Sequence, residues 1–244
     1  MENHFISNPA VDLGPTGYDE ALRIQKKAVL AVKRGYIDRA LLFLEHPPVY
    51  TVGRKPVPEN YIGIIPVATE RGGDITYHGP GQLVIYPILD VRTDGRRDIR
   101  AFVNRIMEAA IGALSTCGVS AEKGENEPGI WCNGMKIGSV GIAVDENVSY
   151  HGVSINISKS VLDGFSRIRP CGMDPSVMSF VQVERDRLIE ALISVFSGKF
   201  GLFGKIPREE FLEGLSGLPS NLPDPLRDSF PQVGGERLHK EERG

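Results

Sequence analysis

Cysteine is scarce in this 244-residue chain, which contains only Cys117, Cys132 and Cys171. An odd and widely spaced set of this kind argues against a disulfide framework. No two of the three have the Cys-x-x-Cys spacing that is common in zinc sites, so we expect no metal site. Each cysteine is therefore interpreted separately, as a packing residue or as a reactive thiol.

The sequence also lacks a long hydrophobic run and an excess of basic residues. No apolar stretch approaches the roughly 20 residues of a membrane-spanning helix, and the first five residues resemble no part of a secretion signal. The formal net charge of -3 provides no basic surface for nucleic acid. We expect a cytoplasmic globular protein that has neither nucleic acid nor a membrane as its partner.

Hydrophobic periodicity predicts several amphipathic helices. One begins at Thr16, with Asp19 as the near-equivalent of a capping-box partner, and is closed by Gly35. A second is capped by Asp98 and ends near Gly118. Further helices are expected over 183–200 and after Pro207.

Runs of apolar residues between these helices predict strands. The continuous run 40–44 indicates a strand that is covered on both faces. Shorter extended pieces are expected at 10–13 and 49–54, and a strand at 148–157 is expected to be broken at His151-Gly152. We expect one domain over residues 1–216, followed by a Pro-rich, charged tail over 217–244 that is flexible.

Asn133-Gly134 is the strongest turn signal in the chain and predicts a β-hairpin. A two-residue loop would pair Cys132 with Met135, Trp131 with Lys136 and Ile130 with Ile137. If no bulge intervenes, alternation places Lys136 on a face with apolar residues further along the strand. Such a lysine is either a side chain that reaches solvent from an edge strand, or a desolvated base or thiolate partner.

A glycine-rich stretch, Arg71-Gly-Gly-Asp-Ile-Thr-Tyr-His-Gly-Pro-Gly-Gln82, precedes a β-branched and aromatic run. Glycine is used where the backbone needs a positive φ or approaches a ligand closely. The stretch therefore predicts either two strand ends that meet in a cleft, or a plain hairpin with a Gly-Pro-Gly turn.

Cys171 lies between Pro170 and Gly172, which exclude a helix, and close to two arginines. Loop exposure and positive surroundings favour a reactive thiolate, although a loop cysteine without chemistry is also consistent with the sequence. Together with Lys136, His78 and His151, Cys171 forms a plausible set for covalent acyl transfer. A thiolate would attack a thioester, a base would move the proton and backbone N–H groups would hold the oxyanion.

Several long motifs in sequence order resemble the signature blocks of the lipoyl(octanoyl) transferases. They are Leu13-Gly14, Glu45-His-Pro-Pro-Val-Tyr-Thr51, Gly53-Arg54, Arg71-Gly-Gly-x-x-Thr-Tyr-His-Gly-Pro-Gly-Gln82, Lys136-Ile-Gly-Ser-Val-Gly141, His151-Gly152 with Asn156, and Arg169-Pro-Cys-Gly172. The resemblance spans roughly residues 11–196. Val177-Met178-Ser179 departs from the Thr-Ser that is usual in the family, and the segment after about residue 200 has no counterpart.

The resemblance implies an α/β (α+β) fold with a mixed β-sheet flanked by helices, like that of the biotin and lipoate protein ligases. It implies an acyltransferase that moves an octanoyl group from octanoyl-acyl carrier protein to a lipoyl-domain lysine, the first step of endogenous protein lipoylation. The acceptors would be lipoyl domains of 2-oxoacid dehydrogenase E2 subunits and the H protein of glycine cleavage. No cofactor and no ATP are implied.

The resemblance also implies roles for particular residues. Cys171 would carry the octanoyl thioester, while Lys136 would favour its thiolate form and shuttle the proton. The residues implied to line the acyl pocket are Arg71, Gly72, Gly73, Asp74, Ile75, Thr76, Tyr77, His78, Ser139, Val140, Gly141, Gly152, Val153 and Ser154. His78 is interpreted as a hydrogen-bonding wall residue rather than as the general base.

Three other functions fit parts of the pattern. An ATP-dependent lipoate or biotin ligase of the same fold would use the lysine against an acyl-adenylate and would need no cysteine. A non-catalytic protein that binds lipoyl domains would keep the fold alone. A Cys-His hydrolase would use His78 or His151 as its base.

Overall fold

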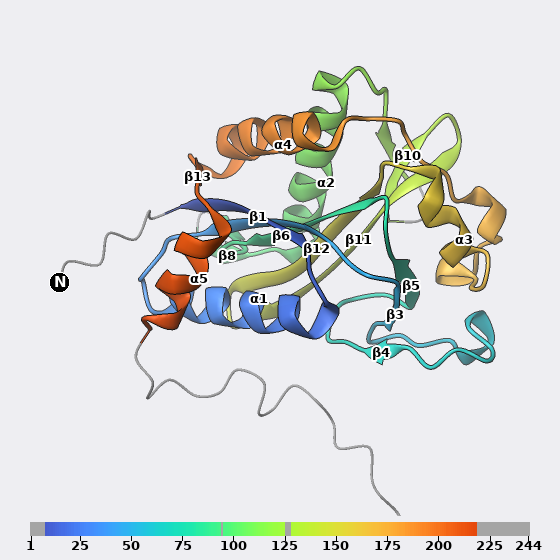
Figure 1. Cartoon of the computed structure of the whole chain (residues 1–244), viewed down its shortest axis with the longest axis horizontal. Helices are drawn as coiled ribbons and strands as arrows, with labels where there is room; N and C mark the ends of the chain where they lie inside the picture. The colour runs from blue at the N-terminus through green and yellow to red at the C-terminus, as the bar shows by residue number, and fades with distance from the viewer. Residues whose placement is uncertain (1–7, 94, 125–127, 219–244) are drawn as a thin grey trace, which may run out of the picture.

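The computed structural model describes residues 8–93, 95–124 and 128–218, and its centre is an eight-stranded mixed sheet (Figure 1). In spatial order the strands are β13 (Gly204–Lys205), β1 (Pro9–Pro15), β2 (Ala40–Glu45), β6 (Gln82–Ile88), β12 (Val148–Asn156), β11 (Met135–Asp145), β10 (Ile130–Cys132) and β9 (Glu122–Lys123). β1 runs parallel to β2 and β13, and the other neighbours are antiparallel.

Helices cover both faces of this sheet, which confirms the expected fold class. α2 (Ile99–Thr116) and α4 (Arg185–Phe200) pack together on one face, while α1 (Tyr18–Lys33) and α5 (Arg208–Ser216) lie on the other (Figure 1). β2 separates two hydrophobic cores: Leu41 and Phe43 belong to the α2–α4 side, and Leu42 and Leu44 to the α1–α5 side. The expectation that residues 40–44 are covered on both faces is therefore confirmed.

A second, smaller sheet lies beside the main one. Its strands are β4 (Val67–Ala68), β3 (Val49–Val52) and β5 (Ile75–His78). Short elements surround it or complete the chain: η1 (Pro58–Asn60), β7 (Arg92–Thr93), β8 (Arg96–Arg97), η2 (Lys159–Val161), α3 (Leu162–Phe165), η3 (Pro170–Gly172) and η4 (Pro175–Val177). This sheet has its own small core, in which Ile75 and Tyr77 pack with Phe165.

The start of α1 differs from the prediction, whereas the start of α2 agrees with it. Asp98 accepts a hydrogen bond from the Ala101 N–H at 2.9 Å and caps α2 as expected. The N-cap of α1 is Gly17, not Thr16, and it has no side-chain cap. Thr16 directly follows β1, where its N–H donates to the Glu45 carbonyl and its hydroxyl donates backwards to the Leu13 carbonyl.

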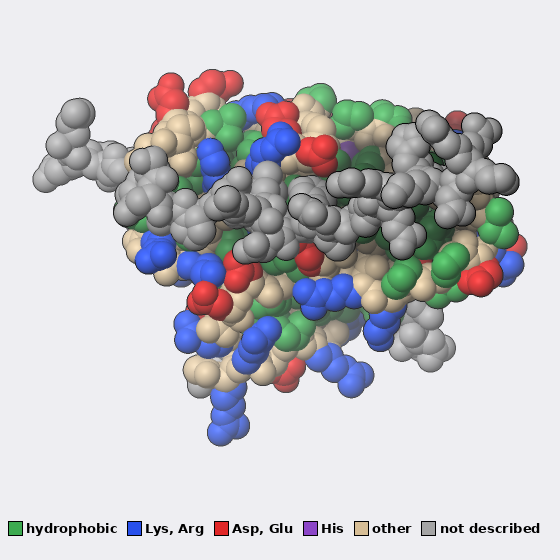
Figure 2. Space-filling view, turned by 90° about the horizontal axis from the view of Figure 1, so that it is seen from below, with side chains coloured by type: hydrophobic (Ala, Val, Ile, Leu, Met, Phe, Trp, Pro, Cys, Tyr) green, Lys and Arg blue, Asp and Glu red, His purple; other side chains and the backbone are tan. Residues whose placement is uncertain are grey.

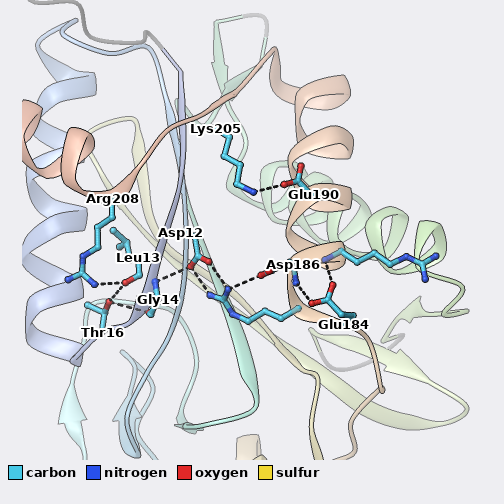
Figure 3. Close-up of polar contacts among 11 residues, drawn as sticks. Asp12, Leu13, Gly14, Thr16, Glu184, Asp186, Glu190, Lys205 and Arg208 are labelled. Atoms are coloured by element: carbon cyan, nitrogen blue, oxygen red, sulfur yellow. Dashed lines mark hydrogen bonds and ion pairs between the residues drawn. The ribbon is translucent and has the colours of Figure 1, made fainter.

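The edge of the sheet at β1 is tied to the C-terminal helices by polar contacts (Figure 3). Arg185 at the start of α4 holds Asp12 with two hydrogen bonds of 2.6 and 2.7 Å. Burial alone would raise the pKa of Asp12, but the bonds to Arg185 and Gly14 leave it lowered. Arg208 in α5 donates to the Leu13 carbonyl at 2.5 Å. The contact of Arg208 fastens the segment after about residue 200, which the family resemblance did not cover, to the sheet.

The strand at 148–157 is continuous where a break was expected. β12 pairs with β11 without interruption from Val148 to Ile155. His151 nevertheless has a left-handed φ of 57°, and the paired register with β6 ends at Val153. The His-Gly pair therefore distorts one edge of the strand without ending it.

Charged side chains of both signs share the face seen in Figure 2, with hydrophobic side chains between them. No helix among the described residues is both long and apolar enough to span a membrane. The tail that was predicted to be flexible spans residues 217–244. Only its first two residues belong to the described part of the chain, and residues 219–244 lie outside it.

Candidate active site

A cavity of about 640 Å³, including its open mouth, is enclosed by residues from β5, β6, β11, β12 and the start of α1. The lining residues that were expected from the sequence come from four separate stretches of the chain. Those expected from the sequence are Arg71, Gly72, Gly73, Asp74, Ile75, Thr76, His78, Lys136, Ser139, Val140, Gly141, Gly152, Val153, Ser154 and Cys171. The glycine-rich stretch is thus the wall of a cleft and not a plain hairpin.

Tyr77 is the one expected residue that does not line the cavity. It alternates with Thr76 and His78 along β5, so its side chain points to the opposite side. There its ring lies 5.1 Å from the ring of Tyr50 and 5.7 Å from that of Phe165. Tyr77 is a core residue of the small sheet.

Lys136 faces the cavity because the hairpin contains a bulge. Cys132 pairs with Met135 and Trp131 with Lys136 as predicted, but Ile130 pairs with Gly138 and not with Ile137. The extra residue shifts the alternation, so the condition under which Lys136 would share a face with the apolar residues further along the strand is not met. Val140, Ile142 and Val144 pack against the α2–α4 core, and Val140 also borders the cavity that Lys136 lines with Ser139 and Gly141.

The side chain of Lys136 is 2% exposed and is held close to the backbone of a neighbouring segment. A Cβ on Gly129 would lie 2.7 Å from its Cε and 3.3 Å from its Nζ. The Lys136 carbonyl accepts a hydrogen bond from the Ser179 N–H at 2.8 Å. Burial of the side chain favours the interpretation of Lys136 as a desolvated base or thiolate partner over that of a lysine that reaches solvent.

Cys171 lies exposed at the mouth of the same cavity. The expectation that no helix forms here needs one correction, because residues 170–172 form a single 3-10 turn. Cys171 itself has a left-handed φ of 53°, which breaks that turn. A positive φ is uncommon for a residue other than glycine, and such strained residues concentrate at functional sites.

The turn that carries Cys171 is anchored from η1. The Arg169 N–H donates to the Asn60 carbonyl at 2.8 Å, and the Asn60 amide donates to Asp74 Oδ2 at 2.6 Å. Asp74 also accepts from the Val57 N–H at 2.9 Å. Asp74 therefore lines the cavity and at the same time fixes the loop that holds Cys171.

A buried hydrogen-bonded row connects β5 to the segment after Cys171. His78 donates from Nδ1 to Gln82 Oε1 at 2.6 Å, and Gln82 donates to Asn156 Oδ1 at 2.9 Å. Asn156 in turn donates to the Ser179 carbonyl at 2.8 Å. Since Ser179 also bonds Lys136, this row links the walls of the cavity to the lysine.

The buried histidines are held in the neutral form. Burial lowers the pKa of His78 to about 3 and that of His46 to about 4. His46, at the end of β2, donates from Nδ1 to the Thr16 carbonyl and accepts from the Tyr86 hydroxyl, both at 2.8 Å. These partners favour the structural interpretation of both histidines over a role as general base at neutral pH.

Two glycines on adjacent strands have little room for a side chain, and at Gly152 the obstacle is backbone. A Cβ on Gly152 would lie 2.1 Å from the Ile85 carbonyl oxygen, and one on Gly141 would lie 3.1 Å from Arg71 Cδ. These two glycines pair across β11 and β12, and Ser139 pairs with Ser154 on the same two strands. A floor of small residues leaves space above the sheet for a ligand.

The structure adds cavity residues that the sequence did not mark as lining. They are Tyr18, Val84, Tyr86, Pro128, His151 and Pro170. Tyr18 and Tyr86 fit a buried helical stripe and a strand run, so their periodicity indicated core packing only. The described residues contain no group of three or more His, Cys, Asp or Glu side chains placed to hold a metal ion.

Comparison with known proteins assigns the family. Residues 17–201 match the lipoyl protein ligase A/B catalytic domain. An octanoyltransferase of Geobacter sp. strain M21 is 41% identical over 175 residues, which cover 71% of this chain and 84% of that protein. A probable octanoyltransferase of Pyrobaculum aerophilum is 44% identical over 168 residues, 68% of this chain and 73% of that protein.

Solved structures share the fold at low sequence identity. Lipoate-protein ligase A bound with ATP has a TM-score of 0.67 at 20% identity, with 86% of this chain and 93% of that chain covered. A putative lipoate protein ligase from T. acidophilum has a TM-score of 0.66 at 19% identity, with the same coverage of 86% and 93%. The fold, the cavity and these similarities together show that the chain belongs to the octanoyltransferases of the lipoyl protein ligase A/B catalytic-domain family.

Proposed function

We propose that this protein transfers an octanoyl group from octanoyl-acyl carrier protein to a lipoyl-domain lysine through a thioester on Cys171. The observation that carries the proposal is that Cys171 and Lys136, 35 positions apart in the sequence, line one cavity. The names of the relatives that are 41% and 44% identical support octanoyl as the group transferred.

The first step forms the acyl-enzyme. The Cys171 thiolate attacks the carrier thioester, the Sγ–carbonyl bond forms and the bond to the carrier sulfur breaks. The carrier leaves as a thiol, and Lys136 supplies the proton that it takes up. One thioester replaces another, so the step is close to isoenergetic and consumes no ATP.

The second step transfers the acyl group to the acceptor. The amine of the acceptor lysine attacks the Cys171 thioester, an amide bond forms and the bond to Sγ breaks. The proton lost by the amine passes to Lys136, which restores its ammonium group and leaves Cys171 as the thiolate for another turnover. The exposed position of Cys171 at the cavity mouth allows two different proteins to reach the same sulfur in turn.

The cavity beyond the sulfur suits a saturated chain along part of its length. Val84, Val140 and Val153 contribute apolar wall, and each buried CH₂ contributes about 0.8 kcal/mol to binding. The acceptors that we propose are the lipoyl domains of 2-oxoacid dehydrogenase E2 subunits and the H protein of glycine cleavage. No metal or cofactor takes part in either step, and we place the reaction in the cytoplasm.

Mass spectrometry of the intact protein tests the proposal. After incubation with octanoyl-acyl carrier protein and no ATP, we expect a mass gain of one octanoyl group that maps to Cys171 and is absent from Cys171→Ser. Addition of a lipoyl domain should discharge it onto one lysine. A protein that gains no mass under these conditions, yet modifies the domain when octanoate and ATP are supplied, would be a ligase.

Two further measurements distinguish the transferase from a hydrolase and from a non-catalytic binding protein. Release of free octanoate at a rate independent of the lipoyl domain would indicate a hydrolase. If Cys171→Ser still restores growth to a strain that lacks octanoyl transfer, the protein acts without a thioester.

A further inference from the structure

One end of the cavity carries polar atoms that a saturated acyl chain cannot satisfy. Tyr18 Oη, Arg71 Nε, Thr76 Oγ1 and His151 Nε2 are buried and have no hydrogen-bond partner among the described residues. All four residues line the cavity, and none is more than 8% exposed. We call these four residues the polar end.

The polar end lies along β11 from Lys136, with Arg71 still close enough to Cys171 for their charges to interact. Arg71 Cδ contacts the position of Gly141, five residues along β11 from Lys136. An extended strand rises about 3.3 Å per residue, so this contact is roughly 15 Å from Lys136. An acyl chain that begins at Cys171 and follows the sheet would direct its far end toward these groups.

The guanidinium of Arg71 is a buried positive charge without a carboxylate partner. Its hydrogen bonds go to neutral oxygens: the Thr51 carbonyl at 2.6 Å, the Thr51 hydroxyl at 3.0 Å and the Gly72 carbonyl at 3.1 Å. No Asp or Glu oxygen of the described residues lies within 4 Å of it. An arginine remains charged when buried, and buried charges are ordinarily paired.

Two carboxylates of this region are engaged elsewhere. Asp74, whose charge acts on Arg71, accepts hydrogen bonds from the Val57 N–H and the Asn60 amide. Glu70 forms an ion pair with Lys26 at 3.3 Å. Its other oxygen lies 3.7 Å from His151 Nε2, which is too long for a hydrogen bond. Glu70 therefore balances Lys26, and neither Glu70 nor Asp74 forms an ion pair with the Arg71 guanidinium.

We propose that the polar end is a subsite for a carboxylate at the far end of a medium-length acyl chain, so that the site accepts ω-carboxyacyl groups as well as octanoyl. The inference rests on the proposed function, because the proposed function places the other end of the acyl chain on Cys171. Arg71 Nε, the Tyr18 hydroxyl and the Thr76 hydroxyl would donate to the carboxylate oxygens. Water would satisfy the hydrogen bonds but supplies no negative charge, whereas a carboxylate supplies both.

Calorimetry with two matched probes tests the subsite without any acyl transfer. The probes are the monomethyl ester of suberic acid and methyl octanoate, which share an eight-carbon chain and a methyl ester and differ in the terminal carboxylate. We expect the half-ester to bind the unmodified protein at least 10-fold more tightly. Equal affinity, or no binding of the half-ester, would overturn the proposal.

Variants then assign the preference to the polar end. Arg71→Met should abolish the preference for the half-ester, and Thr76→Val and Tyr18→Phe should each reduce it severalfold. If Arg71→Met does not fold, as judged by circular dichroism, Tyr18→Phe and Thr76→Val carry the test. The proposal would be contradicted if the preference for the half-ester survived in these variants, or if the affinity for both probes fell equally. Because neither probe is a thioester, failure to bind is distinct from failure to acylate Cys171.

Discussion

Asn60 donates a hydrogen bond from Nδ2 to Asp74 Oδ2 at 2.6 Å, and its carbonyl accepts the Arg169 N–H at 2.8 Å. One residue of η1 thus joins the cavity wall to the turn that holds Cys171. The sequence motifs contain Asp74 and Cys171 but give no indication of Asn60. We interpret Asn60 as a positioning residue for the reacting sulfur.

Substitution of Asn60 should therefore slow acylation without unfolding the protein. In Asn60→Ala the side-chain bond to Asp74 is lost while the backbone carbonyl remains, and we expect Cys171 to acylate roughly 10-fold more slowly because a small misplacement of a reacting group is costly. Initial rates from intact-protein mass spectrometry measure this. Glu59→Ala, at the exposed neighbouring position of η1, is the matched control and should retain the normal rate.

Gly129→Ala should displace Lys136. The added Cβ would lie 2.7 Å from Lys136 Cε and 2.9 Å from the Gly138 carbonyl oxygen, so the lysine or the hairpin must move. We expect a loss of at least 10-fold in octanoyl transfer to a lipoyl domain, with a smaller change in thermal stability. Gly198→Ala is the control, because a Cβ there meets no atom within 4 Å. Equal activity of the two variants would show that the position of Lys136 is not critical.

Lys136→Arg should lose most activity in both steps. A guanidinium stays charged and cannot return a proton, and general acid–base catalysis typically contributes about 10²–10⁴-fold. Formation of the Cys171 thioester and its discharge to the lipoyl domain should be timed separately. Lys136→Met keeps an apolar stem and serves as the uncharged comparison. If Lys136→Arg is fully active while Lys136→Met is not, the lysine acts only as a fixed charge.

The free energy of unfolding should fall as the pH drops below about 6.5, the ordinary histidine pKa. Burial lowers the pKa of His78 to about 3 and that of His46 to about 4. Below about pH 6.5 these histidines are therefore protonated in the unfolded chain but stay neutral in the folded chain. Their contribution is complete above the unfolded pKa and is lost on acidification, by up to about 2 kcal/mol per histidine at pH 5.

Urea unfolding between pH 8 and pH 4.5 measures this loss. In His78→Gln, whose amide can still donate to Gln82, the decline below pH 6.5 should be shallower than in the unmodified protein. Glu70, whose pKa is lowered to about 2 despite the opposing effect of its burial, adds a further loss only below about pH 4.5. The same pH dependence in the variant and the unmodified protein would contradict the assignment to His78.

The local sequence was sufficient to predict those elements that depend only on residues close together in the chain. The Asp98 cap, the apolar run of β2 and the Asn133-Gly134 turn each depend on a few neighbouring residues, and the structure agrees with all three. Thr16 was misassigned because its backbone bonds to Glu45, far along the chain, and this contact overrides its preference for a helix cap.

The sequence by itself determined the family, the fold class and most residues of the cavity, because long ordered motifs are specific and side chains alternate regularly along strands. Only the tertiary structure decided which face Lys136 takes, since one bulge reverses an alternation that periodicity assumes to be regular. It also decided that Tyr77 packs against Phe165 and not into the cavity. The glycine-rich stretch first indicated two strand ends that meet in a cleft. In the folded protein this stretch places Arg71, whose Nε has no partner, beside the unpartnered hydroxyls of Tyr18 and Thr76. That arrangement depends on distances between segments that are remote in sequence, and those distances exist only once the sheets have packed.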